Sequence, residues 1–188
     1  MSGDPDAVVQ LLQAHGIPES TARLLAPVGE ALRNEAVRLQ VEHAASFDID
    51  SGAPAGPLRV GRSTEVDITD QLAAMRPDRC YVSIHTHRTS AAFSDLDLDL
   101  LLKNALIRTV AAVGHDGTWH LLSKRPDALP ADPEVGVRAL HTVLARLSPN
   151  YLAEVRSGRL TRVQALRRVL HTTWRIVAAP LGLRYDRS

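Results

Sequence analysis

Cysteine is nearly absent from this sequence of 188 residues, which contains only Cys80. The chain therefore cannot form an intramolecular disulfide, and it cannot build a zinc site from several thiolates. Eight histidines and 21 acidic residues remain as ligands. Any metal ion that this protein binds must be held by imidazole and carboxylate groups.

An excess of charge of one sign and long apolar runs are lacking as well. The chain has 22 basic and 21 acidic residues, a formal charge of +1, so it is not a polycation that coats nucleic acid. Aromatic residues make up 4%, and no nucleic-acid-binding motif is present. No apolar stretch approaches the roughly 18–20 residues that span a bilayer, and the N-terminus lacks the pattern of a signal peptide. We expect a cytoplasmic protein without a membrane partner.

The hydrophobic pattern predicts an α/β protein with helical extensions at both ends. Helices are expected over 7–15, 19–37, 67–75 and from Ser94, and strands over 41–48, 58–60, 80–85, 107–113 and 119–123. Because the strands are few and helices separate them, we expect a small mixed sheet flanked by helices. The chain divides into a helical segment (1–40), a mixed core (41–125) and a C-terminal helical extension (126–188).

Arginine dominates the C-terminal extension, where helices are expected over 134–147, 150–157 and 161–178. Residues 156–188 contain eight arginines and one aspartate, a formal +7, which leaves −6 for the rest of the chain. One interpretation is a last helix with arginines toward water and four residues toward the core, namely Val163, Leu166, Leu170 and Trp174. The other is a docking surface for an acidic partner. A second copy of the chain is a further candidate partner for the helical ends.

The clearest chemical signal is His85-Thr86-His87, followed by Asp97 ten residues after the second histidine. Side chains on a strand repeat every two residues, so both imidazoles lie on one face. Asp97 lies near the start of the next helix, and a short polar loop can return that helix to the end of the strand. Zinc is typically held by such imidazole and carboxylate ligands, with one position left for water in catalytic sites.

A metal-activated water also needs a base outside the ligand set. Glu42 is the leading candidate because it lies at the start of the first expected strand, which can neighbour the histidine strand. Glu35 lies in an expected helix and Glu65 in a linker-like segment, so both are weaker candidates on geometry. Ser94-x-x-Asp97 by itself also matches a helix capping box.

Together, Glu42, His85-Thr86-His87 and Ser94-Asp95-Leu96-Asp97 resemble the JAMM motif of prokaryotic MPN+/JAB-domain zinc metalloproteases. The resemblance covers about residues 40–125. It implies an MPN-like sheet with cytidine-deaminase-like layering. It departs from the family at Arg88, since the family usually has proline directly after the second histidine.

The resemblance implies a role for each matched residue. His85, His87 and Asp97 would bind Zn²⁺, Glu42 would be the general acid/base, and Ser94 would help to stabilise the oxyanion. The implied reaction is hydrolysis of an amide or isopeptide bond in a peptide or protein conjugate, often at the C-terminus of a ubiquitin-like protein. Two alternatives stay open, namely another metal hydrolase of the phosphoesterase or amidohydrolase type, and an MPN-like binding module without catalysis.

Overall fold

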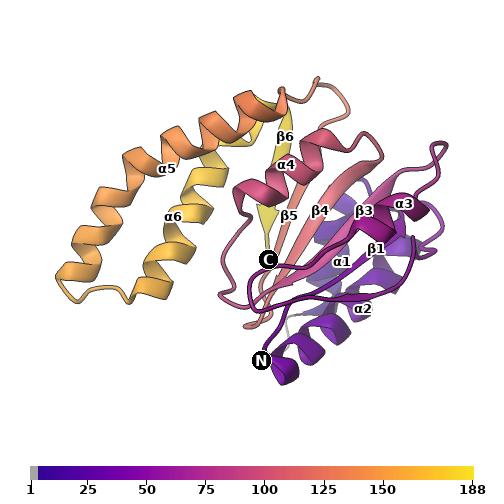
Figure 1. Ribbon diagram of the computed structural model, residues 1–188, viewed down its shortest axis with the longest axis horizontal. Coiled ribbons are helices and arrows are strands. Elements are labelled where there is room, and N and C mark those ends of the chain that lie inside the picture. Colours follow the sequence, from indigo (N-terminus) through magenta and orange to yellow (C-terminus); the bar gives the residue numbers. More distant parts are fainter. Residues whose placement is uncertain (1–3) are drawn as a thin grey trace.

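A six-stranded mixed sheet forms the centre of the computed structural model, which describes residues 4–188 (Figure 1). The strand order is β2-β1-β3-β4-β5-β6. The strands are β1 (His43–Asp48), β2 (Arg59–Val60), β3 (Tyr81–His87), β4 (Ile107–Gly114), β5 (Trp119–Lys124) and β6 (Leu183–Arg187). Only β3 and β4 run parallel, and every other neighbouring pair is antiparallel.

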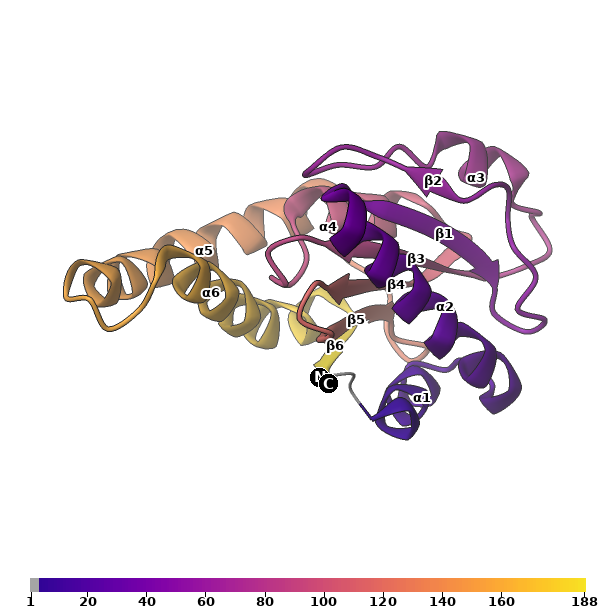
Figure 2. The ribbon, with the colours of Figure 1, turned by 90° about the horizontal axis from the view of Figure 1, so that it is seen from below.

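Helices cover both faces of the sheet (Figure 2). Their bounds are α1 (Pro5–Ala14), α2 (Glu19–Leu39), α3 (Thr69–Ala74), α4 (Asp95–Lys103), α5 (Pro133–Arg156) and α6 (Arg162–Val177), with a short 3₁₀ turn at Ala179–Leu181. One face of the sheet packs against α1 and α2, and the other against α4 and parts of α5 and α6. The expected α/β class is confirmed.

The alternation of side chains along β3 separates the two hydrophobic cores. Val82 and Ile84 belong to the core under α1 and α2, whereas Tyr81 belongs to the core under α4 and α6. Ser83, His85 and His87 share the face of Tyr81 because the side-chain period of a strand is two. The parallel β3–β4 pair requires a crossover, and α4 makes it over this face. The start of α4 is thereby brought above the end of β3.

Close packing of α2 on the sheet depends on Gly29. A Cβ atom at this position would lie 2.1 Å from the Trp119 ring, which is fully buried. Pro27 lies in the same helix, which continues without a break over 21 residues. The predicted helix is therefore confirmed, because the packing of its apolar face offsets the missing hydrogen bond.

The C-terminal segment differs from its sequence prediction in two respects. The helices expected over 134–147 and 150–157 form one continuous helix, α5, with Pro149 inside it. After α6 the chain returns as β6, which pairs with β5 and extends the sheet. This strand was not predicted, since the arginine-rich pattern of residues 183–187 is typical of an exposed segment. The α5–α6 hairpin also stands out from the sheet (Figure 1, Figure 2).

The predicted apolar face of α6 is partly wrong. Trp174 is fully buried as expected, but Val163 and Leu166 are 47% and 41% exposed. The buried stripe instead consists of Ala165, Val169, Thr173, Trp174 and Val177. Helical periodicity gives the spacing of an apolar face, but α5 and the sheet determine which face is covered. Cys80, expected at the start of a buried strand, is exposed because β3 begins one residue later.

Several arginines of the C-terminal segment are engaged within the molecule. Arg159 pairs with Glu154, and Arg167 pairs with Asp116 at 2.9 Å. Among residues 4–188, no helix combines the length and the hydropathy that crossing a membrane requires.

His15 joins α1 to the far edge of the sheet and makes stability depend on pH. Its Nδ1 lies 2.8 Å from Ser123 Oγ, and its Nε2 lies 3.2 Å from the Asp186 carboxylate. Burial lowers the pKa of His15 to about 4, although Asp186 acts in the opposite direction. The unfolded chain therefore binds the proton more readily between about pH 6.5 and pH 4. We expect the free energy of unfolding to fall with decreasing pH across this window, by at most about 1.4 kcal/mol per pH unit from this residue.

Chemical denaturation of the wild type and of His15→Gln at pH 7, 6 and 5 checks this expectation. The variant should lose less stability with decreasing pH than the wild type. His141→Gln is the matched control, because His141 is exposed. An equal pH dependence in the wild type and His15→Gln would contradict the prediction.

Candidate metal centre

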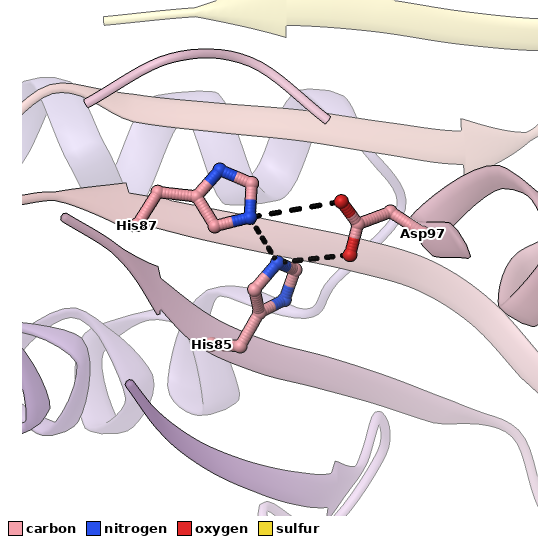
Figure 3. Close-up of side chains that lie close together, drawn as sticks. All are labelled: His85, His87 and Asp97. Atoms are coloured by element: carbon pink, nitrogen blue, oxygen red, sulfur yellow. Dashed lines mark hydrogen bonds and ion pairs between the residues drawn. The ribbon is translucent and has the colours of Figure 1, made fainter. Parts of the chain in front are cut away.

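The two histidines of β3 point to the same side of the sheet, under the start of α4 (Figure 3). His85 is buried at 6% exposure and His87 is partly buried. Their Nε2 atoms lie 2.8 Å apart. The strand continues through His87, two residues beyond its predicted end, so the alternation that pairs the imidazoles is part of the regular sheet. The predicted histidine pair is thus present as a pair in space.

Asp97 reaches the histidine pair from the first turn of α4. Ser94 is the N-cap of this helix, and its Oγ accepts from the Asp97 amide at 3.3 Å. In return the Asp97 carboxylate accepts from the Ser94 amide at 2.7 Å and from the Ser94 hydroxyl at 2.8 Å, both at Oδ2. This capping box fixes the carboxylate and leaves Oδ1 facing His85 Nε2 at 3.1 Å.

The three side chains lie close enough together to hold one metal ion. Their ligand atoms lie within 4.8 Å of one another. A zinc ion with bonds of about 2.0–2.1 Å holds neighbouring ligand atoms about 3.3 Å apart. The two imidazole Nε2 atoms lie 2.8 Å apart, Asp97 Oδ1 lies 3.1 Å from His85 Nε2, and Asp97 Oδ2 lies 3.6 Å from His87 Nε2. The donor set is therefore of the kind that zinc prefers, and its atoms lie close enough together to hold one metal ion.

The surroundings of His87 orient its ring for metal binding. The carbonyl oxygen of Ala91 lies 2.9 Å from Nδ1, which places the proton on Nδ1 and leaves the Nε2 lone pair directed toward His85 and Asp97. Phe93 lies beside both imidazoles, with ring centroids 6.3 Å from His85 and 6.5 Å from His87. This fully buried phenyl ring keeps water from one side of the centre.

The two imidazoles favour the charged form of the Asp97 carboxyl group that lies beside them. Burial disfavours the charge on Asp97, but His85, His87 and the Ser94 amide outweigh it and hold the pKa of Asp97 well below its usual range. Burial also opposes protonation of His85, yet Asp97 and Glu42 raise its pKa overall. Burial and the neighbouring His85 lower the pKa of His87. The Asp97 side chain is therefore anionic at neutral pH.

Glu42 lines the same cavity as the three ligands. The cavity has a volume of about 270 Å³, and its walls include Glu42, His85, His87, Ser94 and Asp97. Ala44 pairs with His85 across the β1–β3 ladder, so Glu42, two residues earlier, falls opposite His87. Glu42 precedes the first residue of β1, but its amide and carbonyl still pair with Arg62 and Gly61. The expected position beside the histidine strand is correct.

The environment of Glu42 suits a group that gains and loses protons near neutral pH. Burial raises the pKa of Glu42 to about 7; His85 acts in the opposite direction, whereas Asp97 and Glu65 raise it further. A general base works best when its pKa lies near the working pH. Of the weaker candidates, Glu35 is exposed on α2 and pairs with Arg38, away from the cavity. Glu65 does line the cavity, but it is mostly exposed and pairs with Arg62.

Ser94 caps α4 and bonds to Asp97, and these contacts compete with the expected role of its hydroxyl in stabilising an oxyanion. Its single hydroxyl proton is donated to Asp97 in this structure. To stabilise an oxyanion, the hydroxyl would have to turn away from the carboxylate. The backbone amide of Ser94 would still hold Asp97 in place at 2.7 Å.

The loop between His87 and Ser94 is braced from α6, which the sequence did not indicate. Trp174 Nε1 donates to the Phe93 carbonyl at 2.8 Å, and Arg167 donates to the Thr89 carbonyl. At the other end of the loop, Ser90 adopts a positive φ of 52°. Ser90 packs directly against Gly114, where an added Cβ atom would lie only 2.5 Å from the Cβ of Ser90. The acceptors are mostly backbone carbonyls, which every residue carries, so no sequence pattern reveals them.

The remaining histidines and aspartates do not join the centre. His120 is buried behind Phe93 and bonds to the Tyr185 hydroxyl at 2.9 Å, as does His171. His141 pairs with Asp95 on the outer side of α4. Within residues 4–188, the group of His85, His87 and Asp97 is the only cluster of at least three such side chains arranged to hold a metal.

Comparisons with family models, with curated proteins and with solved structures gave no match for this chain.

Proposed function

We propose that this protein is a zinc-dependent hydrolase of amide or isopeptide bonds, of the JAMM type. The observation that carries the proposal is the meeting of three ligand side chains from β3 and α4 in one cavity with Glu42, a buried carboxyl group whose pKa is raised to about 7. Ligands, base and cavity are the three components that metal-assisted hydrolysis requires.

Each residue has a defined task in this proposal. When bound, zinc supplies a Lewis acid that polarises the scissile carbonyl and makes a water more acidic. His85, His87 and Asp97 hold the ion, and the Ala91 carbonyl and Ser94 orient two of these ligands. Glu42 takes the proton from the attacking water and delivers it to the leaving amine.

The cavity lining favours a neutral amide over a phosphoester. Three carboxyl groups besides the Asp97 ligand, those of Glu42, Glu65 and Asp67, lie among the residues that line it, and no lysine or arginine does. An anionic phosphoester would meet these carboxylates without a cation to balance its charge. Phosphoesterases and amidohydrolases also need further histidines and aspartates, and the structure between Pro5 and Ser188 brings none to the centre. These features argue against the second type of metal hydrolase.

The proposal extends to the fold and to the substrate class. A mixed sheet between two helical layers, with the ligands at the end of β3 and the start of α4, supports an MPN-like arrangement of residues 41–125. Peptide conjugates and protein conjugates are the proposed substrates, including conjugates of ubiquitin-like proteins. The zinc chemistry is the same for each of them.

Zinc-loaded protein is expected to cleave members of a quenched-fluorescence library of peptide and isopeptide bonds. A chelator should reduce the rate to background, because the ligands alone cannot activate water, and added zinc should restore it. A phosphodiester, bis-p-nitrophenyl phosphate, serves as the control substrate. Turnover of the phosphodiester without cleavage of any amide would contradict the proposal.

A further inference from the structure

A groove continues from the metal centre toward α6. It has a volume of about 490 Å³, and Glu42, His87 and Ser94 line both this groove and the cavity of the metal centre. The loop after β3 forms one wall, through Arg88, Thr89, Ala91 and Ala92, and α6 forms the facing wall. A substrate whose carbonyl lies at the metal centre can therefore extend into this groove on one side of the scissile bond.

The wall from α6 is apolar and partly open to solvent. Val163 and Leu166 are 47% and 41% exposed, and Leu170 completes the stripe at an intermediate exposure. These residues belong to the stripe that the sequence assigned to the core, yet α6 turns a different stripe inward. Apolar side chains along the wall of a groove that joins a reactive centre favour contact with an apolar group of a ligand.

The charges in the groove are separated along its length. Glu42 lies at the end that adjoins the metal centre. Arg88 and Arg167 lie on the two walls. Arg167 is already paired with Asp116, whereas Arg88 is exposed and makes no ion pair with residues 4–188. An anionic group would be repelled by Glu42 and attracted by Arg88.

The groove is held open by fixed contacts. Arg167 of α6 bridges the two walls because it donates to the Thr89 carbonyl in the loop. Asp116 lies outside the groove and accepts from the same guanidinium at 2.9 Å, which fixes its position. Trp174 ties the far end of the loop to α6 at 2.8 Å. A groove that is formed before the ligand arrives binds it at a smaller cost in conformational entropy.

We propose that this groove binds the part of the substrate next to the scissile bond and selects an extended peptide segment with an apolar side chain and a carboxylate. The apolar side chain lies against Val163 and Leu166, and the carboxylate pairs with Arg88. The assignment to a substrate rests on the proposed function, but the binding of such a segment can be measured without any hydrolysis.

Two fluorescein-labelled peptides test this proposal, one of alternating leucine and glutamate and the other with lysine in place of glutamate. Binding is followed by fluorescence anisotropy in the presence of a chelator, so that no turnover occurs. We expect the wild type to bind the glutamate peptide at least about ten times more tightly than the lysine peptide. Arg88→Glu should abolish or reverse this preference, and Leu166→Ser should weaken binding of the glutamate peptide roughly ten-fold.

Arg168→Glu is the matched control, because Arg168 is exposed on the same helix but does not line the groove. It makes the same change in net charge as Arg88→Glu and should leave binding within about two-fold. Equal binding of both peptides by the wild type, or the same loss in Arg88→Glu and Arg168→Glu, would overturn the proposal. The proposal would also be overturned if the wild type were a dimer that Leu166→Ser converts to a monomer, because a second copy of the chain would then occupy the groove.

The failure of this proposal differs from the failure of the hydrolase proposal. Selective binding without cleavage of any amide would retain the groove as a peptide site and overturn the hydrolase. Cleavage that proceeds with equal KM for acidic and basic substrates would retain the hydrolase and overturn the groove. If both hold, Arg88→Glu raises KM for acidic substrates and does not raise it for basic ones.

Discussion

Glu42→Gln is expected to retain zinc and to lose hydrolytic activity by about 10²–10⁴-fold. The side chain lies outside the set of ligands, so the ion keeps its imidazoles and carboxylate. The amide cannot accept a proton from water, and no proton is then delivered to the leaving amine. Burial already disfavours the charged carboxylate, so removal of this charge does not weaken the fold.

Rates of peptide cleavage, measured beside zinc content by elemental analysis, check this result. Glu65→Gln is the matched control, because Glu65 lines the same cavity and loses the same charge. It should keep most of the activity, since its carboxylate is exposed and paired with Arg62. If Glu42→Gln cleaves as fast as the wild type, or if Glu65→Gln is the inactive variant, Glu42 is not the base.

The double variant His85→Ala/His87→Ala is expected to bind no zinc, whereas the wild type binds about one ion per chain. Two of the three ligands disappear, and a single carboxylate on α4 cannot hold the ion against water. Zinc at about 100 times its dissociation constant should raise the melting temperature of the wild type by about 5–10 °C, through about 2.7 kcal/mol of binding energy. The double variant should show no such rise.

Two further variants distinguish the loss of zinc ligands from unfolding of the protein. The double substitution leaves Asp97 as a buried charge without its imidazole partners, which destabilises a protein in its own right. Asp97→Asn removes the charge and retains an oxygen that can accept from the Ser94 amide, so this variant should fold. Its affinity for zinc should nevertheless be much lower than that of the wild type. His141→Ala, which removes an exposed imidazole, should keep the ion. Full zinc occupancy in a folded Asp97→Asn or in the double variant would refute the metal centre.

The arrangement of the candidate centre could be predicted because local rules govern it. Alternation along a strand places His85 and His87 on one face whatever the rest of the fold does. The capping box places the Asp97 carboxylate at the first turn of α4 through contacts that span only three residues. The sequence did not determine the distance between these two units, which the β3–α4–β4 crossover provides.

The features that the sequence did not predict depend on contacts between distant segments. The stripe of α6 that faces inward is chosen by α5 and by the sheet, so Leu166 is exposed although its spacing is that of a core residue. Trp174 was expected in the core, but its bond to the Phe93 carbonyl joins residues that lie 81 positions apart. Periodicity within one segment carries no information about such partners. The groove beside the metal centre arises from these same contacts.

The pairing of β6 with β5 has a consequence for the order of folding during synthesis. The whole of α5 and α6 separates these two neighbouring strands along the chain. A ribosome that adds about 5–20 residues per second therefore leaves β5 with an unpaired edge for several seconds after it emerges. Such an edge can pair with a strand of another nascent chain. The pairing of β6 with β5 then covers this edge and removes it as a site for such pairing.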